Sequence, residues 1–221
     1  MFDAHRHFGS NLKENALYAT SVKTEWHSLL TLQEPAIGGI GALANKPLPT
    51  IEEVEQTLRN YPTLQIAEVG LDRRFSEIEE QQTFLKDILS LAYTLSRSVS
   101  LHCVREDGRM LSTLKALYPH LPILLWHGFT GSMETGKEAA KLGVILSYGI
   151  SLYQSKLARE RAKLISVPYA LETDFETGDN YHGILEEHVR TFSTLSGCSK
   201  ENLIRNNDEI RAILTYHTST R

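Results

Sequence analysis

The chain has 221 residues, of which 41% are hydrophobic, 23% charged and 8% aromatic. This composition excludes an intrinsically disordered chain, because enough apolar side chains are present to offset the entropy lost on folding. The formal net charge of -4 excludes a basic coat over the whole surface, although it is compatible with a local cluster of cations.

Three further features bear on where the protein acts. No run approaches the roughly 18 apolar residues of a membrane helix. The first ten residues, MFDAHRHFGS, lack the basic and apolar regions of a signal peptide. Cys103 and Cys198 are too few for a disulfide framework. We therefore expect one domain over residues 1–221, in the cytoplasm, with no membrane contact and no obligate protein partner.

Short apolar runs predict eight strands. Most runs are apolar throughout rather than alternating, which is typical of strands buried on both faces. Only residues 8–15 separate the first two runs, too few for a full crossover helix. The runs are 1–5, 16–22, 36–43, 64–71, 99–103, 122–129, 144–148 and 169–173.

The segments between the runs are expected to be mostly helical. Thr50 and Glu53 have the spacing of a capping box, and Val54 and Leu58 then lie on one helical face. The longest helical pattern covers residues 77–96. Further helices are expected over residues 132–142, 152–165, 184–195 and 200–214.

Eight strands that alternate with helices are compatible with a (β/α)₈ barrel or with an open doubly wound sheet. No glycine-rich phosphate loop follows an early strand, which argues against a dinucleotide-binding sheet. The length lies near the lower limit for a barrel. We predict an α/β fold, a compact TIM (β/α)₈ barrel with a shortened first crossover.

Residue types that bind metal ions stand at the ends of these runs. His5 and His7 are two residues apart, so on a strand both can face one ion, with Asp3 one layer deeper. A barrel places its active site at the C-terminal ends of its strands, so the candidates are expected at one mouth. The other candidates at strand ends are Glu68, His102, His127 and Asp174.

A single histidine near a strand end is more often a surface or hydrogen-bonded residue than a ligand. The remaining histidines are interpreted in that way: His27, His120, His182, His188 and His217. The joint pattern nevertheless favours a metal site, because buried charges must be paired or metal-bound. Histidines and carboxylates together suit zinc, manganese, magnesium or iron, and six candidates suffice for two bridged ions. We expect one or two divalent metal ions.

In this order, the motifs resemble those of the TatD-like deoxyribonucleases, a branch of the metal-dependent amidohydrolase-like barrels. The resemblance covers nearly the whole chain. The matching elements are Asp3-Ala4-His5-Arg6-His7, Ala67-Glu68-Val69-Gly70-Leu71-Asp72, Val99-Ser100-Leu101-His102, His127-Gly128-Phe129-Thr130-Gly131-Ser132, Leu171-Glu172-Thr173-Asp174 and Asn206-Asn207.

The resemblance implies a role for each candidate ligand. His5 and His7 would hold one metal with Asp174, Glu68 would bridge both metals, and His102 and His127 would hold the second. A hydroxide between the ions would be the nucleophile, and Asp174 is the candidate catalytic base. The implied function is a metal-dependent phosphodiesterase, a deoxyribonuclease that acts on DNA or another phosphodiester.

The sequence departs from the family pattern in loops that would touch substrate. The segment 38–43 lacks the G-x-H-P element, and Val104 stands where H-x-R has its arginine, with Arg105 one position later. Phe175 and Glu176 follow E-T-D where a small residue and a proline are usual. Metal binding is therefore better supported than DNA cleavage.

Two alternatives to a nuclease stay open. One is a small-molecule amide, ester or lactone hydrolase on the same site. The other is a non-catalytic metal-binding barrel, although six open-site ligands exceed the closed tetrahedral set of a structural metal. A nuclease needs cations around the mouth, which Arg6 could join; the residues expected to contact substrate phosphate are Arg73, Arg74 and Arg105.

Overall fold

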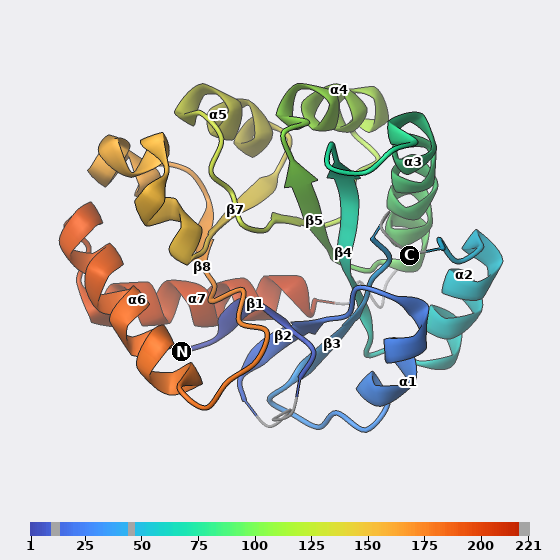
Figure 1. The fold of residues 1–221 in the computed structure, drawn as a ribbon, viewed down its shortest axis with the longest axis horizontal. Helices are drawn as coiled ribbons and strands as arrows, with labels where there is room; N and C mark the ends of the chain where they lie inside the picture. Colours follow the sequence, from blue (N-terminus) through green and yellow to red (C-terminus); the bar gives the residue numbers. More distant parts are fainter. Residues whose placement is uncertain (10–13, 44–46, 217–221) are drawn as a thin grey trace.

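The computed structural model describes residues 1–9, 14–43 and 47–216, which build a barrel of parallel strands ringed by helices (Figure 1). Eight strands follow one another in sequence order around the sheet. Each overlaps one of the runs predicted above, so the predicted fold class is confirmed. The strands are β1 (Asp3–His7), β2 (Ala16–Ala19), β3 (Ile37–Ile40), β4 (Gln65–Asp72), β5 (Val99–Val104), β6 (Leu124–Trp126), β7 (Val144–Tyr148) and β8 (Tyr169–Leu171).

The barrel closes between β1 and the segment that follows β8. The Asp174 amide donates to the His5 carbonyl at 3.0 Å, and the His7 amide donates to the Phe175 carbonyl at 3.0 Å. Below this seam, the Asn207 side chain bonds the backbone of Leu171 on β8 and the carbonyl of Phe2. The position of Asp174 is therefore set by β1 as well as by β8.

Helices cover the outside of the barrel. The Thr50 hydroxyl accepts from the Glu53 amide at 3.3 Å, and the Glu53 carboxylate accepts from the Thr50 amide at 3.0 Å, which confirms the capping box. The elements are η1 (Lys23–Glu25), α1 (Trp26–Leu29), α2 (Ile51–Asn60), α3 (Ile78–Leu95), α4 (Asp107–Leu117), α5 (Met133–Lys141), η2 (Ile150–Gln154), η3 (Lys156–Ile165), α6 (Tyr181–Ser196) and α7 (Lys200–Leu214).

Successive strand residues belong to two different apolar clusters, one outside the barrel and one inside it. Leu124 and Trp126 pack outward against the helices, whereas Leu125 joins the smaller cluster inside the barrel. Ile210 and Leu214 of α7 also belong to the inner cluster. Helix α7 therefore closes one end of the barrel, and the end formed by the carboxyl termini of the strands is left for a site.

One predicted helix is wrong, and two observed helices, the short α1 and α4, were not predicted. Residues 152–165 form two 3₁₀ segments instead of one α-helix, because the Ser155 hydroxyl bonds the Leu152 carbonyl and Arg161 has non-helical backbone angles. Helix α4 was missed because Gly108 weakens its pattern and it buries only a short face.

Two predictions fall partly on residues outside the described ranges. Between β1 and β2, residues 8, 9, 14 and 15 are described and are not helical, while residues 10–13 lie outside. His217 also lies outside the described part of the chain. In the ranges that are described, no helix has the length and apolar character needed to cross a bilayer.

Candidate metal centre

The six side chains predicted as ligands meet at the carboxyl end of the barrel. Two sets of ligand atoms lie within 4.8 Å of one another: His5 with His7 and Asp174, and His5 with Glu68 and His127. His102 stands beside the second set, with Nδ1 3.2 Å from His127 Nε2 and 3.6 Å from Glu68 Oε1. The structure therefore brings all six together.

His7 joins the two carboxylates of the site. Its Nε2 lies 3.2 Å from Asp174 Oδ1, and its Nδ1 lies 3.4 Å from Glu68 Oε2. Burial opposes a charge on His7, but the hydrogen bond that it donates to Asp174 and the charge of Glu68 outweigh burial and raise the pKa of His7. The carboxylates of Asp174 and Glu68 thus both favour positive charge on or beside the His7 imidazole.

The backbone is strained at the two acidic candidates. Glu68 has φ 65° and Asp174 has φ 52°, the left-handed region that residues other than glycine seldom adopt. Glu68 also lies where the β4–β5 register shifts, and such a bulge re-aims a side chain. Strain of this kind, about 1–3 kcal/mol per residue, persists only where the surroundings enforce it and is typical of functional sites.

Asp72 holds His102 from outside the cluster. Its Oδ2 lies 3.1 Å from His102 Nε2, and Arg74 donates to the same carboxylate at 2.6 and 3.0 Å. Burial opposes the charge on Asp72, but the bonds from Arg74 and His102 lower its pKa to about 2. An ionised Asp72 fixes the proton of His102 on Nε2.

Glu172 lies behind His127 in a comparable position, but at a longer distance. The glutamate is fully buried, its Oε1 accepts from the Gly128 amide at 2.6 Å, and the same oxygen lies 3.6 Å from His127 Nδ1. On the other side of the cluster, the Ser100 hydroxyl lies 2.9 Å from His5 Nδ1. Carboxylates and hydroxyls behind histidine ligands are a regular feature of metal sites. The sequence motifs contain Asp72 and Glu172, but a motif alone does not indicate that these carboxylates lie behind the histidines.

Two imidazole nitrogens, His102 Nδ1 and His127 Nε2, face each other 3.2 Å apart, with Glu68 Oε1 3.6 Å from the first. If the imidazole protons are on the other nitrogens, His102 Nε2 and His127 Nδ1, these three facing atoms are all acceptors. Such acceptors repel one another unless a proton or a metal cation lies between them. Ligands bound at about 2.1 Å to one ion lie about 3.0–3.4 Å apart, so the spacing fits a divalent ion.

The electrostatics of the cluster point the same way. Burial opposes a charge on His127, but the adjacent carboxylate of Glu172, together with Asp174 and Glu68, raises its pKa to about 9. His5 Nε2 is buried and has no hydrogen-bond partner among the described residues. The carboxylates favour positive charge between the imidazoles, which a proton or a divalent ion can supply.

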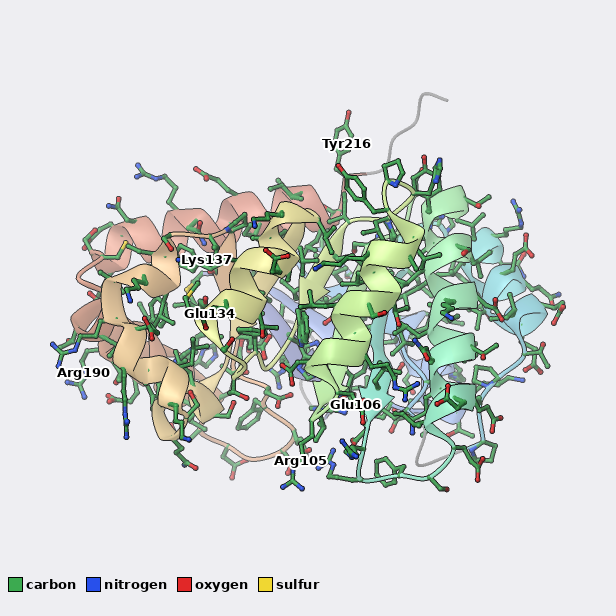
Figure 2. The ribbon with its side chains drawn as sticks, turned by 90° about the horizontal axis from the view of Figure 1, so that it is seen from above. Arg105, Glu106, Glu134, Lys137, Arg190 and Tyr216 are labelled. Carbon is green, nitrogen blue, oxygen red and sulfur yellow. The ribbon has the colours of Figure 1, made fainter. Side chains whose placement is uncertain are left out.

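The arginines expected at the rim differ in their surroundings. Arg6 does not reach the rim, since it is 3% exposed, and Arg74 is engaged by Asp72. Arg73 is exposed, with Glu106 3.6 Å away. Arg105 is exposed and directed into solvent beside Glu106 (Figure 2). Of these four arginines, Arg73 and Arg105 are therefore the two that are both exposed and free of the Asp72 contact.

Comparison with known proteins agrees with the motifs. A family model described as TatD related DNase matches residues 34–211. The 3'-5' ssDNA/RNA exonuclease TatD of Klebsiella pneumoniae is 36% identical over 101 residues, which cover 44% of this chain and 38% of that protein. The chain thus spans well under half the length of this curated relative.

Other relatives match over more of the chain. The uncharacterized metal-dependent hydrolase YjjV of Escherichia coli is 29% identical over 187 residues, 77% of this chain and 69% of that protein. The crystal structure of this TatD homolog superposes with a TM-score of 0.82 at 22% identity over 97% of both chains. A TatD family hydrolase from Entamoeba histolytica superposes with a TM-score of 0.69 at 13% identity, over 91% of this chain and 84% of that one. Because the family model matches most of this chain, residues 34–211, the chain belongs to the TatD-related DNase family.

Proposed function

We propose that the protein is a metal-dependent hydrolase that cleaves phosphodiester bonds, a deoxyribonuclease of the TatD type. The observation that carries the proposal is the pair of facing nitrogens of His102 and His127 beside Glu68. The relative named as a 3'-5' ssDNA/RNA exonuclease supports nucleic acid as the substrate class.

The proposed centre has two parts that share Glu68. His5, His7 and Asp174 would hold one divalent ion, and His102 and His127 would hold the other. Zinc, manganese, magnesium and iron all suit this donor set. Bound ions would supply Lewis acidity toward a phosphodiester oxygen and lower the pKa of a water molecule.

Asp174 is the proposed proton acceptor. Burial opposes its charge, but the hydrogen bond from His7 and the neighbouring imidazoles hold its pKa below the usual range. Its carboxylate is therefore ionised at neutral pH and able to accept a proton at Oδ1 or Oδ2. His7 orients the carboxylate through the contact at 3.2 Å. Arg73, Arg105 and, once released from Asp72, Arg74 would contact substrate phosphates.

One observation favours a second candidate function, hydrolysis of a small amide, ester or lactone. Of the four arginines expected around the mouth, Arg6 is buried and Arg74 is bound to Asp72. Of the four, Arg73, itself 3.6 Å from Glu106, and Arg105 then remain to meet a phosphate backbone, and two cations suit a long backbone less well than four. The same metal centre would serve either reaction.

A metal-reconstitution experiment separates these functions. The purified protein is stripped with a chelator, reloaded separately with Zn²⁺, Mn²⁺, Mg²⁺ or Fe²⁺, and assayed on single-stranded DNA, duplex DNA and simple esters. We expect DNA cleavage that is lost on chelation and restored by metal. Cleavage of esters alone would establish the second candidate. Stoichiometric metal binding without hydrolysis would identify a non-catalytic barrel, and absence of metal binding would refute the centre.

A further inference from the structure

Arg6 is buried among aromatic rings on the side of β1 that faces away from the metal centre. It lies between His5 and His7 in the strand, so alternation directs it to the opposite face. Its guanidinium carbon is 4.0 Å from the ring centroid of Tyr181, 5.0 Å from that of Tyr18 and 5.3 Å from that of Phe175. Its Nε and Nη1 have no hydrogen-bond partner among the described residues. Aromatic faces hold this cation.

The rings come from three different elements. Tyr18 belongs to β2, Phe175 directly follows Asp174, and Tyr181 is the first residue of α6. The rings of Phe175 and Tyr181 also contact each other, with centroids 5.6 Å apart. The loop from β8 to α6 runs alongside β1 (Figure 1). From its position on β1, Arg6 therefore contacts residues at both ends of this loop, Phe175 and Tyr181, and this set of contacts is called the Arg6 clamp.

The loop begins with the residue whose backbone is strained. Asp174 has φ 52°, and the residues on either side of it are tied to β1. Thr173 donates to Asp3 from its amide at 2.9 Å and from its hydroxyl at 2.6 Å. The Phe175 carbonyl accepts from the His7 amide at 3.0 Å. Since strained backbone persists only where its neighbours are held, the direction of the Asp174 carboxylate depends on the contacts of Phe175.

We propose that Arg6 is a positioning residue, whose guanidinium packs against Phe175 and Tyr181 and thereby keeps the Asp174 carboxylate directed at His7 and the metal centre. The inference rests on the proposed function for the role of Asp174. A planar guanidinium can stack on several rings at once, which a lysine ammonium does not do equally well. Arg6→Met removes the cation and keeps most of the side-chain volume, and Arg6→Lys keeps the charge without the plane.

A double-mutant cycle with Asp174→Asn tests the coupling. Wild type, Arg6→Met, Asp174→Asn and the double variant are compared for kcat, KM, Zn²⁺ affinity and unfolding temperature. We expect Arg6→Met to lower kcat and Zn²⁺ affinity by about 10–100-fold, the range for residues that support ligands, with little change in KM. With Asp174→Asn already present, Arg6→Met should lower neither quantity further. Equal losses of kcat and Zn²⁺ affinity in both backgrounds would show a merely structural role and overturn the proposal.

Hydrogen exchange gives a readout that needs neither metal nor substrate. Peptides covering residues 173–181 should exchange faster in Arg6→Met, and the rest of the barrel should be unchanged. Arg109→Met, which removes surface ion pairs on α4, is the control and should leave this segment unaffected. Unaltered exchange over residues 173–181 would overturn the inference.

Two contingencies are covered by the same design. If Arg6→Met fails to fold, Tyr181→Leu removes one aromatic ring that contacts Arg6 and should accelerate hydrogen exchange of residues 173–181. Unaltered exchange of these residues in Tyr181→Leu would again contradict the proposal. If the wild type neither binds Zn²⁺ nor hydrolyses DNA, the proposed function fails, and the exchange result alone decides for or against the clamp.

Discussion

At the scale of single residues, the carboxylates behind the histidines matter as much as the ligands. Asp72 and Glu172 lie beside the outer nitrogens of His102 and His127, at 3.1 and 3.6 Å, and the inner nitrogens face each other at 3.2 Å. A neutral imidazole has one donor and one acceptor, and a partner on one nitrogen decides which atom is left for a metal. Asp72 and Glu172, which are not themselves proposed ligands, can thus determine which nitrogen of His102 and His127 is left to bind a metal ion.

The role of Glu172 can be tested with Glu172→Gln. The amide can donate to His127 Nδ1, which would move the imidazole proton to Nε2 and remove a ligand atom. We expect about 10–100-fold weaker Zn²⁺ binding, together with a change of His127 tautomer in the ¹⁵N NMR spectrum. Glu209→Gln, an exposed change on α7, is the matched control. An unchanged tautomer and unchanged Zn²⁺ affinity would show that Glu172 does not set the proton position.

At the scale of elements, the close approach of β4 and β5 positions His102. A Cβ on Gly70 would lie 1.8 Å from the carbonyl oxygen of His102, which is backbone and cannot move aside alone. In contrast, a Cβ on Gly108 in α4 would meet nothing within 4 Å. The two glycines therefore offer a matched pair of substitutions.

We expect Gly70→Ala to lower the free energy of unfolding by about 1–3 kcal/mol, as overpacking does, and to weaken Zn²⁺ binding because His102 shifts. Gly108→Ala should leave metal binding unchanged and raise stability by up to about 1 kcal/mol, since alanine favours the helix. Urea unfolding and Zn²⁺ titration measure both effects. A Gly70→Ala protein as stable as the wild type would contradict the close packing of these strands.

The strands could be predicted because each is a short apolar run, and the ligands because each ends or follows such a run. Outer contacts such as Arg74 to Asp72 and Glu172 to His127 depend on side-chain directions that the sequence does not specify. Arg6 is not a rim cation, contrary to the expectation from the sequence, because strand alternation from His5 and His7 directs its side chain to the other face of β1. The 3₁₀ segments η2 and η3 depart from an otherwise helical pattern at Ser155, which bonds the Leu152 carbonyl, and at Arg161, whose backbone angles are non-helical.

At the scale of the whole molecule, net charge constrains how a nucleic acid could bind. The formal charge of -4 makes local cations decisive. We expect Arg73→Gln and Arg105→Gln each to raise KM for single-stranded DNA and to reduce the salt dependence of binding by about 0.7 in log–log slope, the value for one phosphate contact. Both variants should hydrolyse a small ester as the wild type does. An unchanged KM and salt slope would remove these arginines from the binding surface.

Stability should also depend on pH through His188, which joins α6 to β7. Burial lowers the pKa of His188 to about 4, against a partial opposing effect of its hydrogen bond to the Tyr148 carbonyl. Between pH 6.5 and 4 the unfolded chain then binds more protons than the folded one, so stability falls as the pH falls through this window. The linkage makes the free energy of unfolding about 3 kcal/mol higher at pH 7 than at a pH below 4, where His188 is protonated in both states.

Urea unfolding at pH 7 and pH 4.5 measures this contribution. His188→Gln should be less stable than the wild type at pH 7 and should lose less stability on acidification. His27→Gln, an exposed change in α1, should follow the wild type at both values. If His188→Gln and the wild type lose equal stability between the two pH values, the histidine is not buried in its neutral form.

The most direct test of the account is a crystal structure of the Zn²⁺-loaded protein with anomalous scattering recorded at the zinc edge. We expect peaks at the carboxyl end of the barrel, about 2.0–2.2 Å from atoms of His5, His7, Glu68, His102, His127 and Asp174. With both sites filled, the two peaks should lie roughly 3.5–4 Å apart on either side of Glu68. Zinc bound only elsewhere on the surface, or a fully loaded crystal with no peak among these six side chains, would contradict it.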